Sequence, residues 1–222
     1  MSTQPAAVPD DELASWIAGG AAELRHPLEP VQVQRLVAYL RLIERWNATY
    51  NLTAIRDPGD MAVQHILDCL AAAAALGRRR QGRGLRRLID VGSGAGLPGL
   101  VFAVALPETE IVCVDSVGKK AAFITQAIAI LEARNATALQ ARVEALERGV
   151  FDVVASRAFA SLVDFTRWTR HLLADNGDWM AMKGKRPSEE IAALTAFHVE
   201  VEPVVVPRLG AERCLVWIRP DA

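Results

Sequence analysis

The sequence has few cysteines and no pattern that would give them a shared role. The three that occur, Cys69, Cys113 and Cys214, are widely separated and odd in number. A disulfide framework or a zinc site normally shows itself as cysteines at short, regular spacings. The sequence therefore predicts no disulfide-stabilised fold and no metal site.

The sequence also lacks long apolar runs and a strong charge of either sign. It contains no run of about 18 apolar residues, so no membrane span is expected. Its first residues include acids and prolines rather than a basic region followed by an apolar one, so we expect no secretory signal and a cytoplasmic location. The formal net charge is −1, so any anionic partner must be met by a local patch.

What is present is enough apolar material for a full core. Hydrophobic residues make up 51% of the 222 positions, which suits one α/β domain with a small appendage. Residues 88–99, with the sequence LIDVGSGAGLPG, stand out within it. A short apolar run, typical of a buried parallel strand, is followed by four glycines and then by an apolar helical segment. This layout holds nucleotide-like ligands at the carboxyl edge of an α/β sheet.

The glycine stretch fits two kinds of nucleotide site. Gly94-x-Gly96-x-x-Gly99, with Asp115 about 20 residues further on, matches the dinucleotide fingerprint. That alignment leaves Asp90 as an uncompensated charge inside a buried strand. If the loop starts at Gly92, Asp90 ends the strand and can accept hydrogen bonds from loop amides or a ligand amine. A turn without a ligand is less favoured, because four glycines cost backbone entropy that packing does not demand.

The first 84 residues predict helices. Asp10 or Asp11 is expected to cap a short first helix, and residues 29–49 carry apolar side chains on one helical face. A third helix is expected over residues 61–76, capped by Asp60 and ended by Gly77. Within it His65 and Asp68 lie three apart, on one face; a structural pair and an RNA-facing role both remain open.

Residues 78–87 form a basic, glycine-containing linker with six arginines. Such a stretch can be a solvated linker, or its guanidinium groups can bind phosphate in a bidentate manner. The sequence leaves both interpretations open.

The remaining residues alternate between strands and helices. This order predicts an α/β fold with a seven-stranded, doubly wound, Rossmann-like sheet and an N-terminal helical extension. We expect residues 1–84 to form the helical segment and linker, and residues 85–222 to form the sheet domain. The expected strands are residues 88–91, 110–115, 137–141, 151–157, 178–183, 199–206 and 213–219, with the last two as an antiparallel pair, and helices over 119–133, 162–173 and 191–197.

Motifs along most of the chain resemble one family. The pattern Asp-x-Gly-x-Gly-x-Gly starting at Asp90 resembles the first motif of S-adenosylmethionine-dependent methyltransferases. Further motifs are WNxxxNLTxI from Trp46, HILD from His65, DVGSGAGLPG from Asp90, DSxxKK from Asp115, RVE from Arg142, SRAFA from Ser156 and KG at Lys183. The full set is similar to the RsmG (GidB) family, the bacterial 16S ribosomal RNA guanine-N7 methyltransferases. Cys69 departs from the serine usual there, and the arginine-rich linker has no counterpart in the pattern.

The resemblance implies a function. The chain would transfer the methyl group of S-adenosylmethionine to N7 of guanine 527 in 16S ribosomal RNA, with the small ribosomal subunit as partner and with neither metal nor membrane. It would act as a monomer in the cytoplasm. Guanine N7 has a lone pair and no proton, so no general base is needed and no catalytic residue is certain. Holding the reactants in line would supply most of the rate enhancement.

The resemblance also implies site residues. Arg157 is both a cofactor-binding and a catalytic candidate, with a structural ion pair as the alternative role. Asn47, Asn51 and Thr53 can contact RNA or only brace their own turn. The cofactor-binding candidates are Asp90, Gly92, Gly94, Gly96, Leu97, Asp115, Val143, Glu144 and Arg157. The RNA-binding candidates are Asn47, Asn51, Thr53, His65, Lys119 and Lys183.

Two other functions compete with this one. An NAD-dependent oxidoreductase can use the same glycine loop, although no residue stands out to handle the proton that accompanies hydride transfer. A non-catalytic ribosome-binding protein can keep the methyltransferase fold. Titration with both cofactors separates the first alternative, and mapping of methylated guanine in ribosomal RNA separates the second.

Overall fold

The computed structural model describes residues 8–149 and 151–221. Among these residues, no helix combines the length and the apolarity needed to cross a membrane. The helices are α1 (Asp10–Glu23), α2 (Pro30–Tyr50), α3 (Pro58–Met61), η1 (Ala62–Leu67), α4 (Asp68–Arg80), α5 (Gly99–Ala105), α6 (Gly118–Leu131), η2 (Val143–Ala145), α7 (Leu162–Thr169), η3 (Arg170–Leu172) and α8 (Ser188–Ala192). The strands are β1 (Arg87–Val91), β2 (Glu110–Asp115), β3 (Ala136–Gln140), β4 (Phe151–Arg157), β5 (Leu173–Lys183), β6 (Phe197–Pro203) and β7 (Cys214–Pro220).

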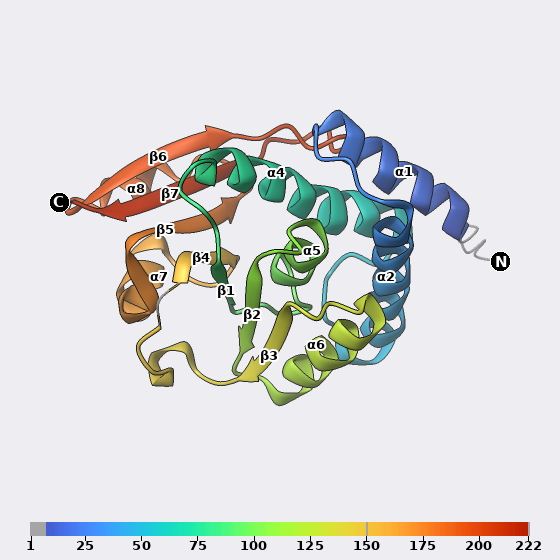
Figure 1. Ribbon diagram of the computed structural model, residues 1–222, viewed down its shortest axis with the longest axis horizontal. Coiled ribbons are helices and arrows are strands. Elements are labelled where there is room, and N and C mark those ends of the chain that lie inside the picture. Colours follow the sequence, from blue (N-terminus) through green and yellow to red (C-terminus); the bar gives the residue numbers. More distant parts are fainter. Residues whose placement is uncertain (1–7, 150, 222) are drawn as a thin grey trace.

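The strands form one mixed sheet in the order β3-β2-β1-β4-β5-β7-β6. The first five strands of the chain run parallel, whereas β7 is antiparallel to both β5 and β6. The expected seven-stranded sheet with a final antiparallel pair is confirmed (Figure 1). Because the order reverses between β1 and β4, a crevice is expected at the carboxyl ends of these strands.

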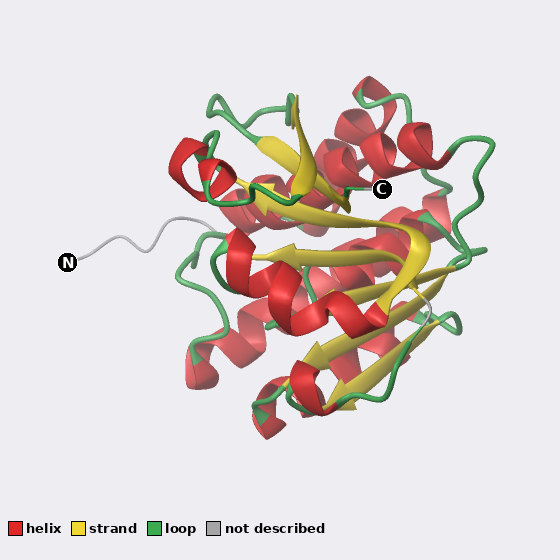
Figure 2. Cartoon of the chain, turned by 90° about the vertical axis from the view of Figure 1, so that its left-hand side faces the viewer, coloured by secondary structure: helices red, strands yellow, loops and turns green. Residues whose placement is uncertain are grey.

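Helices cover both faces of the sheet (Figure 2). One core joins α1, α2, α4, α5 and α6 to one face, and a second, smaller core lies between α7 and the other face. The N-terminal helices thus pack in the same core as α5 and α6. A division of the chain near residue 84 remains a prediction, and residues 1–7 of that segment lie outside the described residues.

Several helix ends differ from the sequence expectation. Pro9, not Asp10 or Asp11, is the N-cap of α1. Asp57, not Asp60, caps α3, because its side chain accepts the Asp60 backbone N–H at 2.9 Å. The helix then includes a π-helical turn, η1, which the sequence did not predict.

Other boundaries also moved. The helical path continues beyond Gly77 to Arg80, so Gly77 is wrong as a stop. The helix expected over residues 191–197 is shorter and earlier, at Ser188–Ala192. Strand β5 starts at Leu173, five residues before the expected start, through an irregular pairing with β4.

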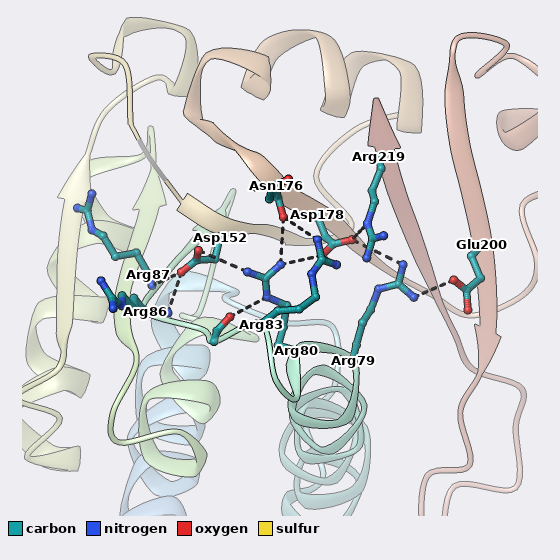
Figure 3. Close-up of polar contacts among 11 residues, drawn as sticks. Arg79, Arg80, Arg83, Arg86, Arg87, Asp152, Asn176, Asp178, Glu200 and Arg219 are labelled. Carbon is teal, nitrogen blue, oxygen red and sulfur yellow. Dashed lines mark hydrogen bonds and ion pairs between the residues drawn. The ribbon is translucent and has the colours of Figure 1, made fainter. Parts of the chain in front are cut away.

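Arg80 shows why α4 runs past Gly77. Its buried guanidinium reaches the fully buried carboxylate of Asp178 at 3.1 Å and lies 3.4 Å from Asp152. The interaction links the end of α4 to β5 and β4 (Figure 3). This tertiary contact outweighs the local preference of a glycine for ending a helix.

The rest of the basic linker joins the same cluster. Asp178 also lies 3.6 Å from Arg79 and 3.7 Å from Arg83, and it accepts a hydrogen bond from Arg219 on β7. Asp152 accepts the backbone N–H groups of residues 86 and 87, at 2.7 and 3.0 Å. A solvated linker is therefore wrong for most of this stretch: it is an ion-paired junction at the edge of the sheet where β1 and β4 begin (Figure 3). Phosphate contacts by its exposed arginines remain a prediction.

We expect Asp178→Asn to destabilise the fold by about 3–5 kcal/mol, because several guanidinium groups would then face one another without a buried counter-charge. Urea unfolding measures this loss. The matched control is Glu132→Gln, which breaks the exposed ion pair between Glu132 and Arg35 and should cost less than about 1 kcal/mol. Equal losses in the two variants would contradict a structural role for the cluster.

Candidate cofactor and RNA site

The glycine loop between β1 and α5 lies at the crevice. Gly92, Gly94 and Gly96 all have positive φ, at 67°, 60° and 79°. A side chain at Gly94 would meet no atom within 3.9 Å, so the backbone there faces open space. At such a φ other residues are strained. At Gly94 the loop therefore presents bare backbone to open space, which a ligand can approach closely.

The loop is held from beneath by the N-terminal helices. The buried Tyr39 hydroxyl, on α2, donates a hydrogen bond to the Ala95 carbonyl oxygen. The loop closes on itself through the Gly96 and Leu97 N–H groups, which both donate to the Ser93 carbonyl at 2.8 and 3.0 Å. Leu97 is buried, and the ligand contact expected of it remains a prediction.

Asp90 is the last but one residue of β1, close to the strand's end as expected, and lies behind the loop. It is fully buried, and its Oδ2 accepts the Gly99 N–H at 2.9 Å. Of the two expected roles, binding a loop amide is thus the one present; binding a ligand amine remains a prediction. Among the described residues its Oδ1 has no hydrogen-bond partner. Burial raises the pKa of Asp90 to about 6, partly offset by the Gly99 N–H.

Asp115, at the end of β2, joins two loops. Its Oδ2 accepts the Gly94 N–H at 3.0 Å and its Oδ1 accepts the Val117 N–H at 2.9 Å. Lys120 Nζ lies 3.7 Å from the same carboxylate. The side chain therefore fixes the glycine loop relative to the start of α6, and it also lines the adjoining cavity.

That cavity has a volume of about 340 Å³ and an even mixture of polar and apolar walls. Four of the residues predicted to bind the cofactor line it: Gly92, Asp115, Val143 and Glu144. Gly94, Gly96, Asp90, Leu97 and Arg157 do not. The wall residues that the sequence did not single out as cofactor contacts are Val114, Ser116, Val117, Lys120, Ala141, Arg142, Ala158, Phe159 and Trp168.

Phe159 and Trp168 are the main residues that sequence reasoning missed. The Phe159 ring packs directly over Gly92, where an added Cβ would lie 2.4 Å from it. It meets the Trp168 ring edge-to-face, with centroids 5.9 Å apart. Phe159 belongs to the SRAFA motif and offered that signal; Trp168 lies on α7, and its place beside the loop comes only from the fold.

Arg157 points away from the cavity into a buried polar network. Its Nη1 donates to the Gln64 carbonyl at 3.1 Å and to His65 Nδ1 at 3.3 Å, and lies 3.9 Å from Asp68. Asp68 pairs in addition with Arg213, at 3.3 Å. The structural ion pair is therefore the role that the geometry supports, and a catalytic or cofactor contact of Arg157 remains a prediction. His65 and Asp68 do share a face, but they meet through Arg157 rather than directly.

The polar residues of the turn after α2 brace that turn. The buried Asn47 donates to the Ile55 carbonyl at 3.0 Å and accepts the Thr53 N–H at 2.9 Å. Asn51 ends α2 in a left-handed conformation and accepts a hydrogen bond from Arg56 at 3.2 Å. Of the two roles left open by the sequence, bracing is the one that these contacts show; RNA contact remains a prediction.

The two lysine candidates differ in surroundings. Lys183, at the end of β5, donates to both carboxylate oxygens of Glu190 at 2.9 and 3.0 Å. Lys119, at the start of α6, is exposed, and its Nζ lies 5.9 Å from the centre of the Tyr50 ring. Lys119 is thus the better placed of the two to contact a further molecule.

His65 is held neutral. Because Arg157 donates to Nδ1, the proton lies on Nε2, which is 2.9 Å from Thr53 Oγ1. Burial first, and then the charge of Arg157, lower the pKa of His65 from 6.5 to about 4. An unfolded chain would bind a proton here at a higher pH, so His65 favours the folded state above pH 6.5, and this contribution is lost as the pH falls through about 4.

We therefore expect His65→Gln to flatten the acid side of the stability curve. The pKa difference corresponds to about 3 kcal/mol, which the natural chain should lose on acidification and the variant should not. Urea unfolding between pH 7 and pH 3.5 measures it. His198→Gln, at an exposed histidine, is the control and should follow the natural chain. Parallel curves for His65→Gln and the natural chain would refute the neutral assignment.

Comparison with known proteins agrees with this geometry. A family model described as rRNA small subunit methyltransferase G (GidB) matches residues 32–216. Ribosomal RNA small subunit methyltransferase G of Verminephrobacter eiseniae is 49% identical over 96% of this chain and 97% of its own length. The protein of the same name from Leptothrix cholodnii is 53% identical over 92% of this chain and 94% of its own length.

Solved structures agree on the fold. A SAM-dependent methyltransferase from Aquifex aeolicus has a TM-score of 0.53 at 13% identity, covering 76% of this chain and 96% of that one. A ribosomal protein L11 methylase from Lactobacillus delbrueckii subsp. bulgaricus has a TM-score of 0.53 at 16% identity, covering 68% and 77%. These similarities concern the fold alone. The family match and the relatives at about 50% identity show that the chain belongs to the GidB family of ribosomal RNA small-subunit methyltransferases.

Proposed function

We propose that this chain transfers the methyl group of S-adenosylmethionine to N7 of a guanine in 16S ribosomal RNA. The observation that carries the proposal is the cavity beside the glycine loop, in a chain about half identical to relatives named for this modification. The cavity lies at the carboxyl ends of β1 and β2, where open α/β sheets bind their ligands.

The residues around the cavity fit this cofactor. The loop offers backbone at Gly94 that no side chain shields, whereas the Phe159 ring packs over Gly92. The Asp115 carboxylate borders the cavity at the end of the next strand. When bound, S-adenosylmethionine supplies an electrophilic methyl group on a sulfonium.

Different residues contact different parts of the cofactor. Gly92, Gly94, Gly96 and Leu97 shape the end for its methionine part, directly or by supporting the loop. Asp115 accepts hydrogen bonds from the ribose hydroxyls, and Val143 and Glu144 flank the adenine. Asp90 supports the loop through Gly99, and its second oxygen is the candidate acceptor for the amine. These roles follow from position at the strand ends and from the family resemblance.

The protein's contribution to the reaction is positioning. The guanine N7 lone pair forms the new bond to carbon as the bond from carbon to sulfur breaks, so the purine gains the positive charge and no proton moves. A protein nucleophile is not required, and none is suitably placed: all three cysteines are buried, and burial raises the pKa of each thiol. Alignment of the reactants accounts for the rate enhancement.

The same proposal specifies the RNA partner, the oligomeric state and the location of the chain. The RNA is met as 16S ribosomal RNA or within the small ribosomal subunit, in the cytoplasm, by a monomer that uses no metal. A basic local surface at the carboxyl edge of the sheet would attract the phosphates, although the net charge of the chain is −1.

Deletion of the gene should remove one N7-methylguanosine from 16S ribosomal RNA, because this chain is the proposed source of that methylation. Mass spectrometry of ribosomal RNA fragments, with primer extension to locate the site, measures this. Re-expression of the chain should restore the mark. An unchanged methylation pattern would instead favour a non-catalytic ribosome-binding role, and binding of NAD without S-adenosylmethionine would favour an oxidoreductase.

Asp115→Ala should weaken S-adenosylmethionine binding by about 1–3 kcal/mol, because hydrogen bonds to a charged acceptor are lost. Isothermal titration gives the dissociation constant. Glu108→Ala removes an exposed acid just before the same strand and should leave binding unchanged. If Asp115→Ala binds the cofactor like the natural chain, Asp115 is not the ribose acceptor.

A further inference from the structure

Tyr50 presents an aromatic ring to solvent on a rigid support. It is the last residue of α2 and is 43% exposed. The Trp46 ring lies beneath it, with centroids 5.0 Å apart and planes tilted by 39°. Trp46 in turn packs edge-on against Phe123 at 5.3 Å and donates from Nε1 to Gln126 at 2.9 Å. The tyrosine ring is thus fixed from below while part of its surface remains open.

One cation lies near this ring, and a second contacts the residue that follows Tyr50. Lys119 Nζ lies 5.9 Å from its centre, near the outer limit of a cation–π contact, so the ammonium is held loosely. Arg56 reaches the adjacent Asn51 side chain at 3.2 Å. Within residues 8–149 and 151–221, neither cation forms an ion pair with an acid, and the Tyr50 hydroxyl makes no hydrogen bond.

The patch is continuous with the proposed reaction site. Lys119 follows Gly118 at the start of α6, and its neighbours Val117 and Lys120 line the cavity beside the glycine loop. The chain has only four lysines, and they follow or end β2 and β5 at the carboxyl edge of the sheet: Lys119, Lys120, Lys183 and Lys185. Strands β2 and β5 are three positions apart in the sheet, roughly 14 Å at ordinary strand spacing. Lysines therefore lie at the carboxyl ends of both β2 and β5, with Lys120 and Lys183 paired to Asp115 and Glu190.

We propose that Tyr50 is a stacking platform for an unpaired base of the RNA substrate, next to the guanine that enters the reaction site. Lys119 and Arg56 contact the phosphates on either side of that base. Aromatic side chains stack on bases of any identity, and neighbouring cations hold the backbone; this combination is typical of single-stranded nucleic-acid surfaces. The inference rests on the proposed RNA methylation and assigns the substrate contact that the cavity residues do not supply.

The first test separates RNA affinity from cofactor affinity. Tyr50→Ala should raise the KM for 16S ribosomal RNA, or for small subunits, at least about fivefold, as loss of one stacked base does. The kcat at saturating RNA and the dissociation constant of S-adenosylmethionine should stay unchanged. Tyr50→Trp should retain the natural KM because the ring is kept. Val31→Ala, at an exposed apolar residue at the other end of α2, is the control and should behave like the natural chain.

The second test concerns the charge. Lys119→Gln should weaken binding of a fluorescein-labelled single-stranded 16S fragment that contains the mapped guanine. It should also reduce the slope of log affinity against log salt by about 0.7, the value for one phosphate contact on a single strand. Arg134→Gln, which removes the same charge beyond the other end of α6, should leave the slope unchanged.

The outcomes distinguish this inference from the proposed function. If the natural chain methylates RNA and Tyr50→Ala does so with an unchanged KM, the stacking platform is wrong and the function stands. If the natural chain methylates no RNA, the function itself fails. Ultraviolet cross-linking of the natural complex, followed by mass spectrometry, should place a nucleotide on Tyr50; a cross-link confined to other peptides would overturn the inference.

Discussion

The carboxylate of Asp115 is the contact on which the site depends. One oxygen accepts the Gly94 N–H and the other accepts the Val117 N–H. A single side chain thereby fixes the loop after β1 relative to the first turn of α6. The cavity lies between these two segments, and Lys119 and Lys120 begin the same helix. Both the floor of the ligand site and the cations beside it follow from one group at the end of one strand.

Much of the fold was predictable from the sequence because its signals are local. The apolar runs that form β1, β2 and β4 are short, rich in β-branched residues and bounded by turn residues. The loop after β1 is recognisable from its high glycine content. The predicted cofactor residues on two neighbouring strands, Gly92 and Asp115, were brought together as parallel topology requires. Val143 and Glu144 joined them from the connection after β3.

Prediction from the sequence failed for residues whose main contacts lie far away in the chain. The arginines after residue 77 find their counter-charges on β4, β5 and β6, and no local pattern reveals that pairing. For the same reason, local sequence patterns did not predict the helix end at Arg80 or the contact between Trp168 and Phe159. Arg157 is instructive in another way, because its position at a strand end suggested a ligand contact. The N-terminal helices supply His65 and Asp68 as partners instead.

One cluster of arginines and the four lysines therefore lie at different ends of the sheet, although Arg142 and Arg157 also lie at the carboxyl end. At one end, buried Asp178 forms ion pairs with four arginines: Arg79, Arg80, Arg83 and Arg219. The lysines lie at the other end, where Lys120 lines the cavity. Because arginine forms fixed, multidentate contacts and lysine remains a mobile point charge, this division suits a rigid scaffold with an adaptable anion-binding edge. The net charge of the whole chain, −1, gives no sign of this separation of arginines and lysines.

Two buried ionisable groups beneath that edge oppose one another in their response to pH. Burial raises the pKa of Asp90 to about 6 and lowers that of His65 to about 4. For Asp90 the folded state binds its proton more tightly than the unfolded state, so its contribution is present at low pH and is lost as the pH rises through about 6. The contribution of His65 has the opposite sign and is lost as the pH falls through about 4. Over the interval between these values the two effects largely cancel, so the loop support from Asp90 and the Arg157 network from His65 can both stay buried without making the fold strongly pH-dependent there.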